Sequence, residues 1–238
     1  MKRFWTHVSI EPLETGYGLS LDARPVKTPA RARLTLPTAA LAAAVAEEWA
    51  SVKDKLNPAA MPLTGLANAA QDLIAADPAA HSARLAAYAA TDLLCYRAEN
   101  PPPLIARQAE LWDPVIAWAQ ARHECHLHTT QGLMPIAQPP ETLARLHAAL
   151  AARAPAALAA HAQLIPLSGS LLLALALEEG HITAEAAWAA ADVDDQFQAE
   201  NWGEDADALA LRAYNKAAFM AATRFLILQA DDTAPQSR

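Results

Sequence analysis

The sequence predicts an α+β protein, with a small N-terminal antiparallel β domain followed by a larger α-helical domain. Near the N-terminus, short segments alternate apolar and polar residues, which is the period of a half-buried strand. From residue 39 onward, apolar residues recur at helical spacing, and alanine, the strongest helix former, becomes abundant. We expect the β domain at residues 1–37 and the α-helical domain at residues 38–238. We leave open whether the helix that runs to about residue 60 belongs with the strands.

Four short strands are expected in the β domain, within residues 4–10 and at residues 19–21, 26–28 and 34–36. Val8 and Ile10 alternate with polar neighbours, and Gly16-Tyr17-Gly18 is typical of a turn before the second strand. A tight turn is expected at Asp22-Ala23-Arg24-Pro25, because proline presets one backbone dihedral angle. These segments indicate a small antiparallel sheet or a partly closed barrel.

Helices are expected through the rest of the chain. Thr38 can cap the first of them, over residues 39–52, because its hydroxyl can accept a bond from a free backbone N–H. The other expected helices span residues 63–75, 79–96, 103–122, 140–152, 156–177, 183–202 and 205–229. Residues 126–128 are predicted to form a strand or an extended loop, and Gly203 is expected to end a helix.

The composition argues against several classes of function. The chain has 18 basic and 26 acidic residues, for a net charge of -8, whereas nucleic-acid binding relies on lysine and arginine. The longest apolar run, residues 171–177, is far shorter than the roughly 20 residues of a membrane span. Residues 1–10 lack the apolar core of a signal peptide, and two cysteines are too few for a disulfide framework. We therefore expect a soluble protein of the bacterial cytoplasm that binds neither nucleic acid nor membrane.

Two segments have some features of a metal site or a reaction centre. Residues 123–128 hold three histidines, a glutamate and a cysteine, but tetrahedral zinc usually takes ligands from two separated pairs, and no second pair has suitable spacing. Ser168-Gly169-Ser170 lacks the preceding strand and the Gly-x-Ser-x-Gly form of a hydrolase nucleophile, so a helix break near Pro166 is the simpler interpretation. A glycine-rich phosphate loop is also absent from the sequence. We expect no catalysis, no metal and no cofactor.

The block from Thr91 to Pro114 is the most distinctive part of the chain. It places a charged pair, aromatic residues and a thiol in a region that is otherwise rich in alanine and leucine. Trp112 and Trp118 are expected to be buried on a helix that Pro114 kinks. Buried polar groups must be satisfied, so we expect a structural polar network made of Asp92, Arg97, Gln108, Trp112 and Asp113, with Asp92 and Arg97 on one helix.

A second unusual stretch, residues 192–205, combines acidic residues with Phe197 and Trp202. A solvated acidic face is one interpretation of this helix. A protein-binding patch is the other, since an accessible tryptophan surrounded by carboxylates is typical of interfaces. The residues of this stretch favour neither interpretation.

These motifs, taken in order, resemble the ATP-twelve family of assembly chaperones for the alpha subunit of the F-type ATP synthase. The resemblance rests on Thr91-Asp92-Leu93-Leu94-Cys95-Tyr96-Arg97, on Gln108-x3-Trp112-Asp113-Pro114 and on Gln198-x3-Trp202-Gly203. It also includes Arg24-Pro25-Val26-Lys27-Thr28-Pro29 and Met61-Pro62-Leu63-Thr64-x-Leu66-Ala67-Asn68, and so spans nearly the whole chain. The chain departs from the family pattern at Ala23, where a glycine is expected, and this concerns the geometry of one turn.

The resemblance implies transient binding of unassembled alpha subunit, without catalysis and without a small-molecule substrate. It implies that a functionally sensitive acidic position lies ahead of the Trp-Gly pair, with Asp194-Asp195 as the first choice for it and Glu200 as the second. The expected client-binding residues are Asp194, Asp195, Gln198, Glu200 and Trp202. The alternative is a small-molecule enzyme or ligand-binding module that uses a cleft between the two domains.

Overall fold

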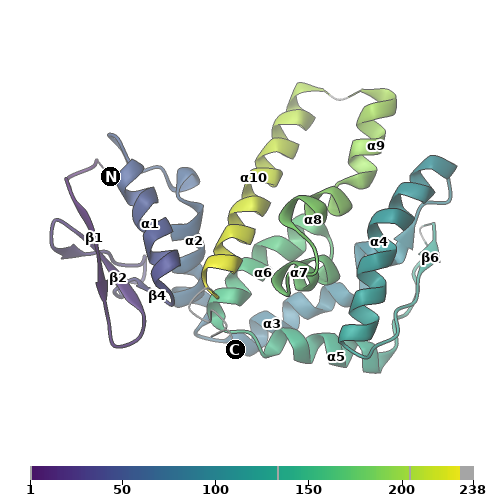
Figure 1. Cartoon of the computed structure of the whole chain (residues 1–238), viewed down its shortest axis with the longest axis horizontal. Coiled ribbons are helices and arrows are strands. Elements are labelled where there is room, and N and C mark those ends of the chain that lie inside the picture. The colour runs from purple at the N-terminus through teal and green to yellow at the C-terminus, as the bar shows by residue number, and fades with distance from the viewer. Residues whose placement is uncertain (1, 133, 204, 231–238) are drawn as a thin grey trace, which may run out of the picture. The chain divides into compact units, whose positions relative to one another are not determined.

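The computed structural model describes residues 2–132, 134–203 and 205–230, and they form a small antiparallel sheet followed by helices, as the sequence predicts (Figure 1). The chain divides into two compact units. Unit 1 contains the described residues of Met1–Pro78, Ala154–Ala160 and Ala221–Arg238, and unit 2 contains those of Ala79–Arg153 and His161–Met220. The domain boundary after residue 37 stays a prediction.

The sheet of unit 1 consists of β1 (Val8–Pro12), β2 (Tyr17–Leu21), β3 (Arg24–Pro25) and β4 (Thr35–Leu36). β1 pairs antiparallel with β2, and β3 and β4 both pair antiparallel with β2 as well. The third strand is not at residues 26–28 as predicted but at Arg24–Pro25, inside the predicted turn, and the fourth is shorter than predicted. The chain between them leaves the ladder and keeps one bridge, from Lys27 to Arg33. Leu19, Leu34 and Leu36 are fully buried and form the core face of this sheet.

The turn between β2 and β3 explains why a glycine is expected at Ala23. Asp22 and Ala23 both have positive φ angles, 46° and 66°, as the hairpin turns that match strand twist require. The Asp22 carboxylate accepts hydrogen bonds from the backbone N–H groups of Thr6 at 2.9 Å and His7 at 2.8 Å. These bonds, led by the one from His7, lower the pKa of Asp22. The Asp22 carboxylate thus fixes this turn against the backbone at Thr6 and His7, although Ala23 and not glycine stands in the turn.

Two helices of unit 1 complete its core. α1 (Ala39–Ser51) begins at Thr38, whose Oγ1 accepts a hydrogen bond from the Leu41 N–H at 3.0 Å, so the predicted cap is confirmed. α1 contacts both β1 and β2 and buries Leu41, Val45 and Trp49. A short 3₁₀ turn, η1 (Pro58–Ala60), precedes α2 (Pro62–Ala69).

α2 continues into one turn of π-helix, η2 (Ala70–Ile74), whose polar side chains reach β4 and the loop before it. The Gln71 Oε1 accepts a hydrogen bond from the Thr35 N–H at 3.0 Å, and the Gln71 Nε2 donates to the Arg33 carbonyl at 2.8 Å. The Asp72 carboxylate accepts from the Ala30 N–H at 2.9 Å. Side chains of a helix thereby satisfy backbone groups that a further strand would otherwise pair with.

Unit 2 is largely helical (Figure 1). It holds α4 (Pro102–Arg122), α5 (Pro140–Ala151), α7 (Leu171–Glu178), α8 (Ala184–Ala191), α9 (Val193–Trp202) and all but the first residue of α3 (Pro78–Ala86). α6 (Pro155–Ser168) and α10 (Ala206–Leu228) each have residues in both units. β5 (Tyr96–Arg97) and β6 (Thr130–Gln131) form a two-stranded parallel sheet, and residues 126–128 are an extended loop. α7 contacts α4 and α8, and every residue from Leu171 to Leu177 is buried.

The predicted helix at residues 79–96 is wrong in its second half. α3 ends at Ala86 and is followed by two 3₁₀ turns, η3 (Ala87–Thr91) and η4 (Leu93–Cys95), before β5 begins. Asp92 stands between the turns with ψ at 132°, and its side chain accepts a hydrogen bond from the Leu94 N–H. A short acidic side chain that bonds the nearby backbone competes with helix formation in this way. Asp92 and Arg97 therefore do not share a helix.

Two other predicted helices are each broken once. Residues 156–177 break at Gly169, whose φ of +67° favours glycine, and Ser170 then caps α7 by accepting from the Leu173 N–H at 3.0 Å. This confirms a structural role for the Ser-Gly-Ser segment. Residues 183–202 break at Asp192, which separates α8 from α9. Trp118, which was expected to be buried, is half-buried and stacks on His181.

Candidate functional site

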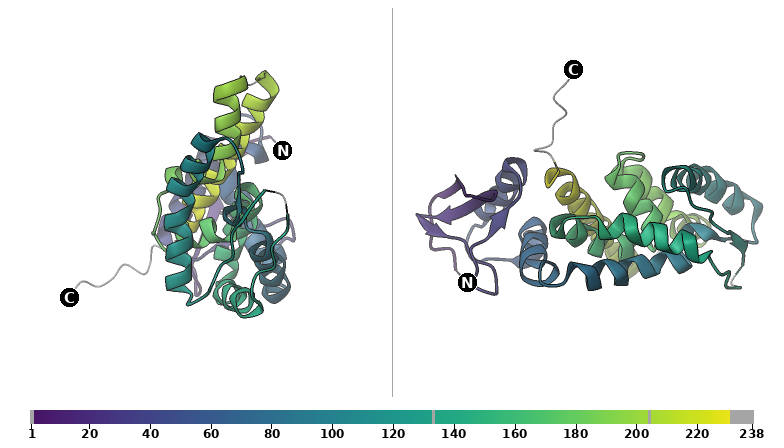
Figure 2. Two further views of the ribbon diagram at one scale, coloured as in Figure 1. Left: turned by 90° about the vertical axis from the view of Figure 1, so that its right-hand side faces the viewer. Right: turned by 90° about the horizontal axis from the view of Figure 1, so that it is seen from below.

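The acidic stretch folds into a helical hairpin made of α9 and the first half of α10 (Figure 1; Figure 2, left). Asp194 and Asp195 lie in the first turn of α9, where carboxylates suit the positive end of the helix dipole. Gly203 follows the helix with φ at +80°, as expected of a helix end. The Asp205 carboxylate then accepts a hydrogen bond from the Ala208 N–H at 2.7 Å and so begins α10.

Contacts with α4 hold α9 in place. The Gln108 side chain, which is 1 % exposed, donates a hydrogen bond to the Asp194 carboxylate at 2.7 Å. Arg107 forms an ion pair with Glu200 at 2.7 Å and lies over the ring of the buried Phe197. The hydrogen bond from Arg107 lowers the pKa of Glu200. Two of the five predicted client-binding side chains are thus engaged within the protein.

An ion pair between the half-buried Arg212 and the buried Asp192 links the two helices of the hairpin. The Arg212 guanidinium of α10 donates from its Nε to both oxygens of Asp192, at 3.0 and 2.8 Å, and its Nη2 also reaches that carboxylate. Asp192 lies at the start of α9 and is 7 % exposed. Removing one partner of such a pair leaves an uncompensated buried charge, so the pair fixes the hairpin geometry.

The remaining predicted client-binding residues face solvent. Among the described residues, the exposed Asp195 carboxylate has no hydrogen-bond or ion-pair partner, and Gln198 is also exposed. Trp202 is 75 % exposed. The first half of α10 adds more exposed apolar side chains, namely Leu209, Leu211 and Tyr214. The hairpin therefore combines an unpaired carboxylate with large apolar side chains in contact with water, which is typical of an interaction surface.

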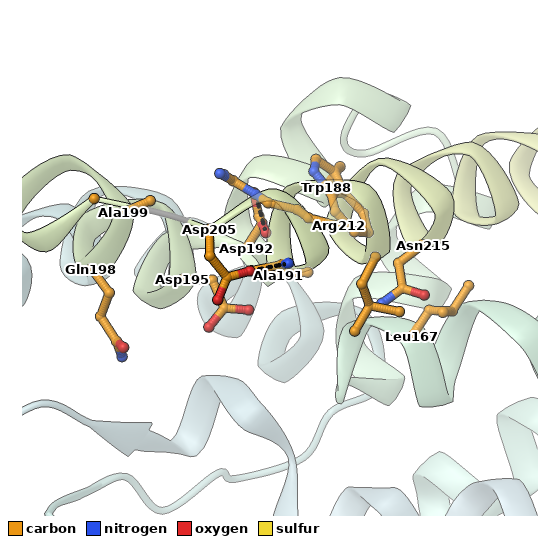
Figure 3. A pocket seen from close by; sticks show the side chains of 13 residues that line it. Leu167, Trp188, Ala191, Asp192, Asp195, Gln198, Ala199, Asp205, Arg212 and Asn215 are labelled. Atoms are coloured by element: carbon orange, nitrogen blue, oxygen red, sulfur yellow. Dashed lines mark hydrogen bonds and ion pairs between the residues drawn. The ribbon is translucent and has the colours of Figure 1, made fainter.

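A groove of 370 Å³ runs between the helices of the hairpin (Figure 3). Asp195, Gln198 and Ala199 line it from α9, with the three-and-four spacing of one helix face. Ala208, Leu211, Arg212 and Asn215 line it from α10 at the same spacing, and Leu167, Trp188 and Ala191 also contribute. Gln198 and Leu167 lie toward opposite ends of this groove (Figure 3).

The predicted structural network separates into two parts. In the first, Arg97 pairs with Asp113 at 2.7 Å and lies over the Trp112 ring, and Gln108 accepts a hydrogen bond from the Ala98 N–H at 2.8 Å. The Trp112 Nε1 donates to the Ala190 carbonyl of α8 at 2.8 Å. These four residues therefore connect α4 with the segment after β5, with α8 and, through Gln108, with α9.

Asp92 forms the second part by itself. Its carboxylate is fully buried and accepts hydrogen bonds from the Ser170 Oγ at 2.8 Å, the Leu172 N–H at 3.0 Å and the Leu94 N–H at 3.1 Å. Burial raises the pKa of Asp92 to about 6, against the lowering effect of these bonds. Asp92 thus holds the N-terminus of α7 against the 3₁₀ turn η4.

Sequence reasoning missed Arg107, Arg212 and the exposed residues of α10. Arg107 lies one residue before Gln108 on α4, and both residues contact α9. The motif that includes Gln108 therefore lies next to it, but only the packing of α9 on α4 identifies Arg107 as a contact. Arg212 carries no sequence signal, because its partner lies twenty residues earlier on another helix. The exposed Leu211 and Tyr214 lie three residues apart, which is the spacing of apolar residues on one face of a helix. The sequence alone does not show whether such a face is exposed or buried.

Within the described residues, no group of three or more histidine, cysteine, aspartate or glutamate side chains is placed to hold a metal ion. His126 and His128 have ring centroids 5.2 Å apart, as two side chains on one face of an extended segment. The same part of the chain contains no helix with the length and apolar character needed to cross a membrane.

Comparison with known proteins adds the following similarities. The chain matches the family described as ATP12 chaperone protein over residues 2–120. A crystal structure of Atp12 from Paracoccus denitrificans is 44% identical, with a TM-score of 0.91, over 96% of this chain and 98% of that one. A lysine-for-aspartate mutant of the same Paracoccus protein is 43% identical, with a TM-score of 0.91, over 96% of this chain and 97% of that one. A candidate chaperone from Agrobacterium tumefaciens is 40% identical, with a TM-score of 0.90, over 95% of this chain and 85% of that one.

Proposed function

Since the chain belongs to the ATP12 chaperone protein family, and is therefore an ATP synthase assembly chaperone, we propose that its client is the unassembled alpha subunit of the F-type enzyme. An alpha subunit that awaits its beta partners exposes apolar surface, and such a surface is prone to aggregate. The chaperone covers this surface until beta subunits replace it.

The observation that carries the choice of surface is that the Asp195 carboxylate, on the same helix as the exposed Trp202, has no partner among the residues that the structure describes. Asp195, Gln198 and Trp202 are the residues that contact the client in this proposal. Asp194 and Glu200 belong to the same surface, and their bonds to Gln108 and Arg107 also fix the orientation of α9. Of the acidic positions that the family resemblance implies, Asp195 is therefore the one assigned to the client.

A chaperone must release its client, so the interaction has to be specific without being too strong. Exposed charges steer association and fix register, while they add little affinity in water. A few apolar anchors such as Trp202 supply most of the binding energy. The surface of α9 has both components. The network of Arg97, Trp112, Asp113 and Gln108 has a structural role in this proposal, because it joins α4 to α8 and α9.

The direct test is light scattering of isolated alpha subunit at rising temperature, with and without the chaperone. The wild type should suppress the aggregation. Asp195→Lys should weaken binding by about 30-fold or more, because reversing a charge at a complementary contact costs on the order of 2 kcal/mol. Circular dichroism of the variant should match the wild type, since the Asp195 side chain makes no bond within the described residues.

Asp207→Lys is the matched control for this test. Asp207 is exposed on the same hairpin, on α10, and does not line the groove. Asp207→Lys changes the net charge by the same amount as Asp195→Lys, so the comparison separates the loss of a local contact from a general effect of net charge. Full protection of the alpha subunit by Asp195→Lys would reject the assigned role, and equal losses in both variants would show that only net charge matters.

A further inference from the structure

We infer that the groove between α9 and α10 receives an arginine or lysine side chain of the client, with Asp195 as its counterion. This inference rests on the proposed function and specifies the chemistry of the client segment. It is carried by three properties of the groove, which are its balance of charge, its apolar wall and its surroundings on the hairpin.

The charge balance of the groove is negative. Its lining contains three carboxylates, Asp192, Asp195 and Asp205, and one guanidinium, Arg212. Arg212 is held by Asp192 through hydrogen bonds of 3.0 and 2.8 Å, so this pair is internally compensated. Asp205 accepts one backbone N–H, and Asp195 has no hydrogen-bond or ion-pair partner among the described residues. The groove therefore presents two carboxylates that no cation of the described chain neutralises.

The rest of the lining suits the aliphatic stem of a long basic side chain. Leu167, Leu211 and the buried Trp188 give the groove an apolar wall, and Ala191, Ala199 and Ala208 leave space between the helices. Lysine and arginine lay their methylene groups along apolar surface while the charged head stays at a polar rim. Leu167 lies at one end of the groove and Gln198 at the other, so stem and head have separate places (Figure 3).

The surroundings of the groove identify its occupant as part of a larger polypeptide. Leu211 is 61 % exposed and Tyr214 is 68 % exposed, and they lie three residues apart on one face of α10. Trp202 is the last residue of α9, at the tip of the hairpin, and its side chain is 75 % exposed. A free amino acid or small cation would leave these apolar side chains uncovered. A client segment with one basic residue among apolar residues would cover them and fill the groove.

The test uses the full-length chaperone with a photocrosslinking residue in place of Gln198 and isolated alpha subunit as the probe. The crosslinked client peptide, identified by mass spectrometry, should contain an arginine or lysine next to the crosslink. Replacing that client residue by alanine should weaken binding about tenfold. Asp195→Asn should weaken binding by a similar factor, and the two changes together should cost no more than one, because they remove the same contact.

Asp207→Asn serves as the control, because it removes one exposed carboxylate of α10 outside the groove. It should leave the affinity within about twofold of the wild type. Leu211→Ser should reduce affinity through the apolar wall, and its effect should be independent of salt, whereas that of Asp195→Asn should shrink as salt screens the contact.

Three results would overturn the inference alone: unchanged affinity of Asp195→Asn, a crosslinked segment without a basic residue, or fully additive effects of the two changes. In each of these cases the wild type still binds the alpha subunit, so the proposed function stands. Absence of any complex between wild type and alpha subunit would overturn both proposals.

Discussion

Replacing Asp92 by asparagine should change how the stability of the protein depends on pH. Asp92 is fully buried, and both of its oxygens accept hydrogen bonds from groups at the start of α7 and in the η4 turn. Burial raises the pKa of Asp92 from 3.8 to about 6. Asparagine has nearly the same shape but cannot titrate. Its amide NH₂ group would face the Leu172 N–H, so two hydrogen-bond donors would oppose each other there.

The sign of the effect follows from this raised pKa. Between pH 3.8 and about 6 the folded state binds more protons at Asp92 than the unfolded state does, so stability falls as the pH rises through this range. The stabilising contribution of the protonated carboxyl is complete below the unfolded pKa and lost above the folded one. At about 1.4 kcal/mol for each pKa unit, the total change is about 3 kcal/mol.

The measurement is urea unfolding of wild type and Asp92→Asn at several pH values from 4 to 7, followed by tryptophan fluorescence. Other carboxylates contribute equally to both proteins, so they cancel in the difference between the two unfolding free energies. The advantage of the wild type over the variant should shrink by about 2.4 kcal/mol between pH 4 and pH 7, since at pH 4 part of the total change has already occurred. A difference that stays constant with pH would refute the reasoning. Ser170→Ala is the control, since it loses a hydrogen bond but keeps a buried carboxyl that titrates.

Two further changes test the geometry of the sheet. Gly16→Ala should destabilise the protein by about 3 kcal/mol, because Gly16 has φ at +89° and an added Cβ would collide with the backbone carbonyl oxygen of Leu36; an unchanged melting temperature would contradict this. Ala23→Gly should stabilise it by about 1 kcal/mol, because Ala23 has φ at +66°, a conformation that glycine adopts without strain. Calorimetry should show a higher melting temperature for the second variant, and a lower one would count against strain at this turn.

The sequence predicts the fold well wherever local signals decide the structure. Alternation of apolar residues locates β1 and β2, and Thr38 marks the start of α1, because capping and periodicity act over a few residues. The helical break at Asp92 is not predictable in this way. It depends on the partners of Asp92, Ser170 and Leu172, which lie far away in the sequence.

The candidate site is predicted in part for the same reason. The stretch at residues 192–205 is recognisable as unusual, and its helix and the break at Gly203 follow from local rules. Which carboxylate is free depends on Gln108, Arg107 and Arg212, which belong to other helices. Asp194 and Asp195 are adjacent and chemically identical, and only packing distinguishes the half-buried one from the exposed one.

The contacts of Gln71 with the β4 margin matter for a protein that works among unassembled chains. An open row of backbone donors and acceptors at a sheet margin invites strand addition by any extended polypeptide nearby. The π-turn at Ala70–Ile74 places the Gln71 amide against that row, at Thr35 and Arg33, and the Asp72 carboxylate against the preceding turn, at Ala30. An extended neighbouring chain would thus find the backbone groups of Thr35 and Arg33 already bonded, so strand addition at this margin is disfavoured.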